Sequence, residues 1–158
     1  MAALKIRINP DPVLRKKARK VTSIDDSVQK LIDNMIETLH ESSGVGLAAN
    51  QVGALLRIVV IHIPDEELLV LINPEVVETK GERTVVEGCL SIPGYQAEIS
   101  RAEIVKVKGK GRHGRIIRRK ATDLLAQAIQ HEVDHLNGVL YIDYLSDIGQ
   151  LTKTSSVL

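Results

Sequence analysis

Residues 123–136 read DLLAQAIQHEVDHL, and their apolar side chains recur at the spacing of a helix that packs one face inward. His131 and His135 are separated by one helical turn, which places them about 40° apart around the axis. Both imidazoles can therefore bind one metal ion. Glu132 is displaced to the side, where its carboxylate can reach a water molecule on that metal without being a ligand.

A third ligand is needed, because a catalytic metal site usually has three protein ligands and one open position. Cys89 is the only cysteine and lies in a tight Gly-Cys-Leu-Ser-Ile-Pro turn. A lone cysteine is most often a small buried apolar residue, but beside the histidine pair Cys89 is the better candidate ligand. The remaining histidines are more simply interpreted as surface residues or as residues hydrogen-bonded within the protein; they are His40, His62 and His113.

Composition fits one soluble domain, because the chain has 158 residues and is 44% hydrophobic. With three Tyr, no Phe and no Trp, it lacks the aromatic platform typical of proteins that bind single-stranded nucleic acid. The net charge of +1 gives no general attraction to DNA or to an anionic membrane. A single cysteine excludes an intrachain disulfide, and the N-terminus lacks the apolar run of a signal peptide. We therefore expect a cytoplasmic protein.

The sequence as a whole predicts one α+β domain over residues 1–158. Short mixed or antiparallel sheets are expected around a central helix, residues 123–136, which carries His131 and His135. An amphipathic helix is predicted near the N-terminus, capped by Ser23 and apolar at helical spacing as far as Leu39. Residues 76–79 and 83–86 are expected to pair with each other across a turn. The expected strands are 57–63, 68–72, 76–79, 83–86, 95–99, 104–108 and 114–120.

Three segments, in order, resemble the signature motifs of the peptide deformylases of bacteria and organelles. They are Gly44–Gln51 (GVGLAANQ), Glu87–Ser91 (EGCLS) and His131–His135 (HEVDH). The resemblance implies a metal-dependent hydrolase that removes the formyl group from formylmethionyl nascent polypeptides and releases formate. It also implies one divalent metal ion per chain, natively Fe(II), with zinc, nickel or cobalt able to occupy the same site.

The resemblance assigns roles to individual residues. Cys89, His131 and His135 would be the metal ligands, and Glu132 would take a proton from water and pass it to the leaving amine. The oxyanion would be stabilised by the Leu90 backbone N–H and the Gln51 side chain. The residues expected to bind the peptide or its methionine side chain are Gly44, Val45, Gly46, Val85, Gly88, Leu124 and Ala128. Gln127 departs from the aliphatic residue often found near this pocket.

Residues 106–120 hold eight Lys or Arg residues, and Lys106, Lys108 and Lys110 alternate along one expected strand. The simpler interpretation is a solvated hairpin. The sharper one is a surface for transient contact with ribosomal RNA, near which nascent chains emerge.

Two other functions share this pattern. A zinc endopeptidase also carries H-E-x-x-H, although its third ligand would lie beyond the helix, and cleavage of unformylated peptides would favour it. A metal- or peptide-binding module without activity is the second alternative. A binding module would not need Glu132 or Gln51. Replacing Glu132 should therefore lower the reaction rate of an enzyme and leave the function of a binding module unchanged.

Overall fold

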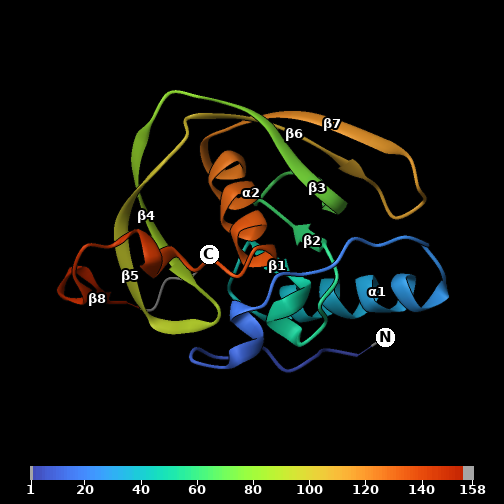
Figure 1. Ribbon diagram of the computed structural model, residues 1–158, viewed down its shortest axis with the longest axis horizontal. Coiled ribbons are helices and arrows are strands. Elements are labelled where there is room, and N and C mark those ends of the chain that lie inside the picture. The colour runs from blue at the N-terminus through green and yellow to red at the C-terminus, as the bar shows by residue number, and fades with distance from the viewer. Residues whose placement is uncertain (1, 155–158) are drawn as a thin grey trace.

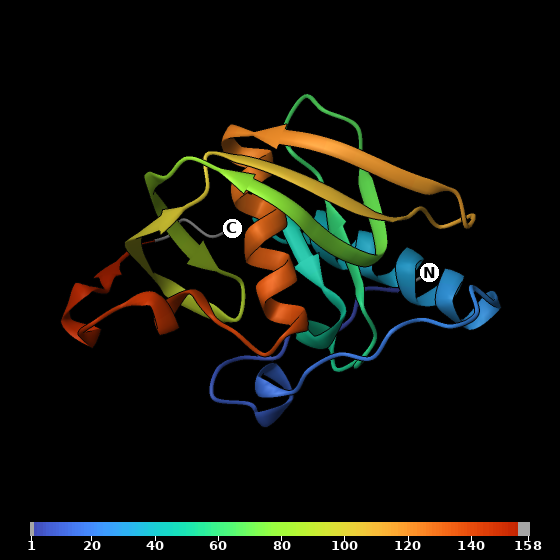
Figure 2. The same ribbon diagram turned by 45° about the horizontal axis from the view of Figure 1, so that its top comes forward.

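The computed structural model describes residues 2–154, which form two α-helices and two antiparallel sheets (Figures 1 and 2). The larger sheet has the strand order β1-β2-β3-β6-β7 and the smaller β4-β5-β8, so the predicted α+β class is confirmed. The helices are α1 (Asp26–Glu41) and α2 (Asp123–Leu136), and the strands are β1 (Gly46–Ala48), β2 (Ile58–Ile61), β3 (Leu69–Lys80), β4 (Arg83–Cys89), β5 (Ile92–Arg101), β6 (Ile104–Lys110), β7 (Ile116–Thr122) and β8 (Thr152–Lys153). Short 3-10 helices span Pro12–Arg15, Ala49–Val52, Tyr141–Tyr144 and Ile148–Gln150.

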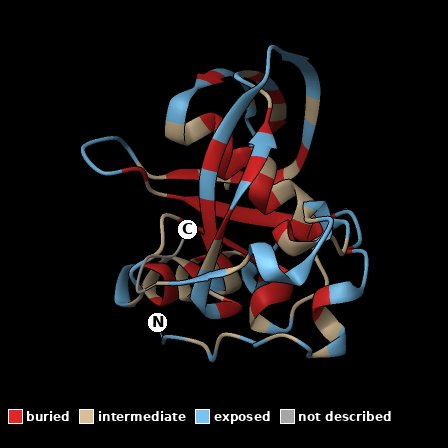
Figure 3. Cartoon of the chain, turned by 90° about the vertical axis from the view of Figure 1, so that its left-hand side faces the viewer, coloured by how far each residue is buried: buried red, intermediate tan, exposed pale blue. Residues whose placement is uncertain are grey.

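Helix α2 lies between the two sheets (Figure 1). Its apolar residues, including Ala128 and Ile129, share a buried cluster with Val59 and Ile61 of β2. The alternate residues of β2 face the other way and pack against α1. Because both faces of β2 are covered, its four residues are all buried, which explains its unbroken aliphatic sequence (Figure 3).

The two helices begin and end close to their predicted positions. Asp25, and not Ser23, caps α1, because the Asp25 carboxylate accepts a hydrogen bond of 3.0 Å from the Val28 N–H. The predicted Ser23 cap is therefore wrong. Thr122 is the residue before α2, and its side chain makes no capping hydrogen bond. No helix within residues 2–154 is long and apolar enough to cross a membrane.

The predicted pairing of residues 76–79 with residues 83–86 is wrong. The end of β3 pairs with β6 in the larger sheet, whereas β4 pairs with β5 in the smaller one. Residues 81–82 connect β3 to β4 and carry the chain from one sheet to the other, and Gly81 has a φ of 70°, which favours glycine. This crossing places the end of β4 beside α2 (Figure 2).

Candidate metal centre

His131 and His135 of α2 meet Cys89, the last residue of β4. The Nε2 atoms of the two histidines lie 3.3 Å apart, and Cys89 Sγ lies 3.2 Å from His135 Nε2. The three donor atoms all lie within 4.8 Å of one another, and all three residues are buried. The structure thus brings together the three side chains that the sequence singled out as ligands.

These distances fit a small divalent metal ion. Nitrogen and sulfur ligands of a tetrahedral metal form bonds of about 2.0–2.3 Å, which places neighbouring donor atoms about 3.3–3.6 Å apart. The separations of 3.2 and 3.3 Å are close to that range. These two separations fit a shared metal ion, and the third, between Cys89 Sγ and the donor nitrogen of His131, is no more than 4.8 Å.

Glu87, on β4, orients His131 through its second ring nitrogen. The Glu87 carboxylate lies 2.7 Å from His131 Nδ1, which leaves His131 Nε2 facing Cys89 and His135. Arg101 binds the same carboxylate through two nitrogens, at 2.5 and 3.1 Å, and also bonds Asp134 at 2.7 Å. Sequence reasoning used Glu87 only as part of a motif and assigned it no role.

Charge stabilises this arrangement in a buried setting. Burial by itself would raise the pKa of Glu87, but attraction to His131 and hydrogen bonds from His131 and Arg101 hold it at about 2. Burial by itself would lower the pKa of Arg101. Its bonds to Glu87 and Asp134 outweigh burial and raise the pKa of Arg101 above its ordinary value. Glu87 is therefore a fixed carboxylate acceptor for His131 at neutral pH.

Glu132 follows His131 on α2, and its side chain is buried. Both of its carboxylate oxygens are buried and lack a hydrogen-bond partner within residues 2–154. Burial, assisted by the nearby charges of Glu87 and Asp134, raises the pKa of Glu132 to about 7, although His131 and Arg101 oppose the rise. A buried, unpartnered carboxyl group with a pKa near neutrality is suited to accept and release a proton.

Gly46 leaves the space that Glu132 occupies. A Cβ atom at position 46 would lie only 2.5 Å from Glu132 Oε2. At Gly44 a Cβ atom would lie 2.8 Å from the Leu90 side chain. Both glycines therefore allow close approach of the loop to α2 and to the residue after Cys89.

Gln51 and Asn50 join the same loop to the centre. The Gln51 side chain accepts from the Ala48 N–H and donates to Ser91 Oγ at 3.1 Å, and its amide nitrogen lies 3.7 Å from Cys89 Sγ. The Asn50 amide donates to the carbonyl of His135. Asn50 was missed by sequence reasoning, although a polar residue among buried small ones is a detectable signal.

The expected substrate-binding residues fall into two groups. Val45, Leu124 and Ala128 belong to the apolar cluster between α2 and the larger sheet, whereas Val85 lies in the cluster of the smaller sheet that contains Cys89. Gly88 is buried in β4, opposite Gln96 of β5. Leu124 and Ala128 are thus on the same helix as His131 and His135, whereas Val85 and Gly88 are on the same strand as Cys89.

Strand β1 is an edge strand of the larger sheet within the described residues. It pairs with β2 on one side, and the Val45 carbonyl just before it accepts from the His62 N–H at 2.7 Å. That carbonyl is therefore already used by the sheet. The opposite edge of β1 is where an extended peptide could add as a further strand.

Gln127 and the remaining histidines are not part of the Cys-His-His cluster. The Gln127 amide donates to the Val86 carbonyl at 3.1 Å and to Glu87 at 3.3 Å, so it supports β4. His40 and His62 contact each other at 2.9 Å, and His113 is exposed.

Comparison with known proteins shows the family to which the chain belongs. The model of the family described as "Polypeptide deformylase" matches residues 3–150. The peptide deformylase of Dehalococcoides mccartyi strain CBDB1 is 57% identical over 152 residues, covering 96% of this chain and 91% of that protein. The crystal structure of a Legionella pneumophila peptide deformylase is 44% identical with a TM-score of 0.91, covering 94% of this chain and 89% of that one. A Synechococcus elongatus peptide deformylase solved in complex with actinonin is 42% identical with a TM-score of 0.90, covering 95% and 82%. The chain belongs to the polypeptide deformylase family.

Proposed function

We propose that this chain removes the formyl group of N-formylmethionyl polypeptides with one metal ion held by Cys89, His131 and His135. The observation that carries the proposal is the buried Cys-His-His cluster beside an unpartnered Glu132. When bound, the metal ion would lower the pKa of a water ligand and polarise the formyl carbonyl. Residues 1–158 would act as a single catalytic domain, because strands from both halves of the described residues 2–154 pack against α2.

Glu132 would move the proton. Its carboxylate would accept a proton from the attacking water and deliver it to the amine as the carbon–nitrogen bond breaks, leaving formate. The absence of a hydrogen-bond partner for either oxygen within residues 2–154 supports this assignment, because nothing in that part of the protein competes for the proton. Gly46 would leave room for the carboxylate, since a side chain at this position would collide with it.

The developing oxyanion would be stabilised by the Gln51 side chain and the Leu90 backbone N–H. The Gln51 amide is held beside Cys89 by its bonds to Ala48 and Ser91. Its second N–H, which contacts Cys89 Sγ at 3.7 Å, is the one that would turn to the oxyanion.

The peptide would bind along the open edge of β1, where Gly44, Val45 and Gly46 allow close backbone approach. Its methionine side chain would contact the apolar groups that flank the metal cluster, with Gly88 lining the approach from β4. The residues proposed for this apolar contact are Val45, Val85, Leu124 and Ala128.

We propose Fe(II) as the native metal. A thiolate with two imidazoles is a soft ligand set that suits Fe(II) or zinc and disfavours magnesium or calcium. Metal analysis after purification without oxygen should find iron, and activity should decay faster in air because iron and Cys89 can both be oxidised. Equal decay with and without oxygen would contradict the assignment to iron.

We further propose a transient contact with the ribosome in the cytoplasm, through the outer face of β6 and β7. Lys106 lies opposite Lys120 and Lys108 opposite Arg118, and like charges in such positions destabilise a sheet unless an anion lies over them. Only Lys106 of these four has an ion pair within residues 2–154, with Glu78 at 3.0 Å. Ribosome affinity should fall with salt and in the Arg118→Gln/Lys120→Gln variant. A salt-independent affinity would contradict this contact.

The reaction is tested by formate release from formyl-Met-Ala-Ser, with protein purified without oxygen and supplied with Fe(II) or Ni(II). We expect rapid release of formate and no cleavage of unformylated Met-Ala-Ser. Peptide-bond cleavage would instead support an endopeptidase. If the metal-loaded protein neither released formate nor cleaved the peptide, the result would support a binding module.

A further inference from the structure

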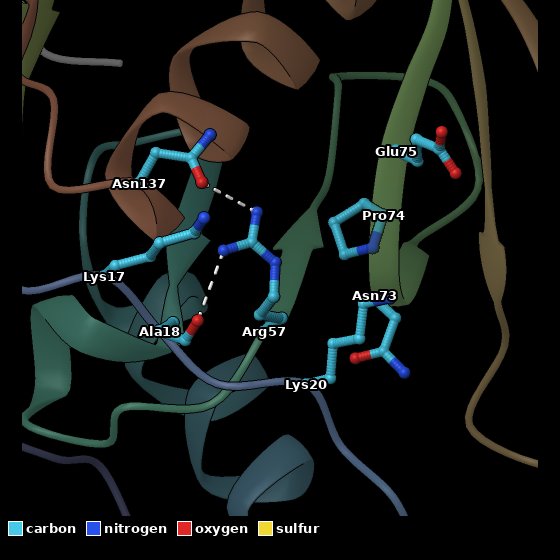
Figure 4. A pocket seen from close by; sticks show the side chains of 8 residues that line it. All are labelled: Lys17, Ala18, Lys20, Arg57, Asn73, Pro74, Glu75 and Asn137. Atoms are coloured by element: carbon cyan, nitrogen blue, oxygen red, sulfur yellow. Dashed lines mark hydrogen bonds between the residues drawn. The ribbon is translucent and has the colours of Figure 1, made fainter.

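A surface hollow of about 570 Å³ lies away from the metal cluster, between the N-terminal segment, β3 and the end of α2 (Figure 4). None of the metal-cluster residues lines it. Its walls are strongly polar, with three cationic side chains and one carboxylate. The lining residues are Lys17, Ala18, Lys20, Arg57, Asn73, Pro74, Glu75 and Asn137.

Arg57 forms one wall and is held rigidly. Its Nη1 donates to the carbonyls of Ala18 at 3.3 Å and Leu136 at 3.0 Å, and its Nη2 donates to Asn137 Oδ1 at 2.9 Å. These bonds use three of the five guanidinium N–H groups. The hydrogen bonds drawn from Nη1 and Nη2 lead toward Ala18 and Asn137, whereas Pro74 lies on the opposite side (Figure 4). The unused Nε–H and second Nη2–H therefore form a two-donor edge that faces the Pro74 side of the hollow.

The cations of the hollow lack counter-charges. Lys17, Lys20 and Arg57 make no ion pair within residues 2–154, and Glu75 is the only acidic residue in the lining. Burial lowers the pKa of Arg57, which is the signature of a partly desolvated cation without an anionic neighbour. A bound anion would compensate for that desolvation.

We propose that this hollow binds a phosphate group, with the free edge of Arg57 as a two-pronged donor and with Lys17 and Lys20 at the rim. A planar pair of N–H donors matches two oxygens of a phosphate, and the lysines neutralise its second charge. The phosphate could be carried by a small molecule or by one nucleotide of an RNA strand, since both present the same chemistry. This site is independent of the proposed deformylation chemistry.

The test is a titration of the zinc-loaded full chain with inorganic phosphate at constant ionic strength, followed by the NMR signal of the Arg57 Nε–H. We expect a saturable shift of that signal. Arg57 supports two backbone carbonyls and could unfold the chain if replaced, so the lysines are changed instead. The Lys17→Gln/Lys20→Gln variant should bind phosphate about tenfold more weakly or worse, because two cations are lost.

The matched control is Lys16→Gln/Lys30→Gln, which removes the same charge from exposed positions outside the hollow. It should change the affinity by less than about twofold. An absent or non-saturating Arg57 shift, or equal weakening in both variants, would overturn the proposal. If a short RNA displaces phosphate, as followed by the Arg57 Nε–H signal, RNA is the molecule that carries the bound phosphate group. Phosphate binding without competition would identify a small molecule.

Discussion

The protein contains two pairs of contacting histidines, and only one pair is part of a candidate metal centre. His40 and His62 approach to 2.9 Å on a largely exposed surface, and His62 also contacts the Glu66 carbonyl. His131 and His135 approach to 3.3 Å in the interior. Proximity of two imidazoles is therefore not what distinguishes the metal centre.

The difference lies in what surrounds each pair. The buried pair has a thiol at 3.2 Å, from Cys89, and a carboxylate that fixes the His131 ring, from Glu87. The exposed pair is not part of any Cys, His, Asp or Glu cluster identified as a possible metal site within residues 2–154. A third ligand and an orienting partner thus convert a histidine contact into a site, as expected for metal ligands whose second nitrogen is hydrogen-bonded.

The largest expected effect is on metal binding. His135→Ala should weaken metal affinity by at least about a hundredfold, because it removes a ligand and not merely an outer partner. His62→Ala, the matching change in the exposed pair, should leave metal content unchanged. Metal content after dialysis against a chelator measures both. Equal metal loss in the two variants would remove the distinction between the pairs.

Removing the orienting carboxylate should have a smaller effect. Glu87→Gln keeps the size of the side chain but leaves Arg101 with Asp134 as its remaining acidic partner, and it weakens the hold on His131. We expect a metal affinity about 10–100-fold lower, the range typical of such outer partners. Competition with a chelating dye would measure it, and unchanged affinity would mean that His131 is oriented by packing alone.

Crowding Glu132 should lower activity without removing the metal. Gly46→Ala would bring a methyl group against the Glu132 carboxylate. The carboxylate would have to move by up to about one ångström, and this displacement should lower kcat/KM by about a hundredfold or less. Gly149→Ala is the control, because a Cβ atom there meets nothing closer than 3.5 Å. Full activity of metal-loaded Gly46→Ala would refute the close-approach role.

The smallest effect concerns a helix cap remote from the chemistry. Asp25→Ala should destabilise the protein by about 1 kcal/mol, because the first turn of α1 loses its acceptor. Ser23→Ala should change stability by less than about 0.5 kcal/mol. Urea unfolding compares the two, and the reverse order would restore Ser23 as the cap.

Features carried by local periodicity were predictable from the sequence. Helix α2 and strand β2 were found because apolar spacing reports which faces are buried. The pairing of β3 with β4 was wrong because a local turn does not reveal that the chain changes sheets at Gly81. The orienting role of Glu87 depends on His131 and Arg101, which lie 44 and 14 residues away along the chain and are brought together only by the fold.

The central claim is that one buried centre holds the metal while Glu132 transfers the proton. It is tested most directly by measuring metal content and formate release on the same samples of wild type and Glu132→Ala. We predict equal metal content and a rate per bound metal lower by about 10²–10⁴-fold or more in the variant. An unchanged rate per bound metal would contradict the role of Glu132, and loss of the metal itself would show that Glu132 is a ligand.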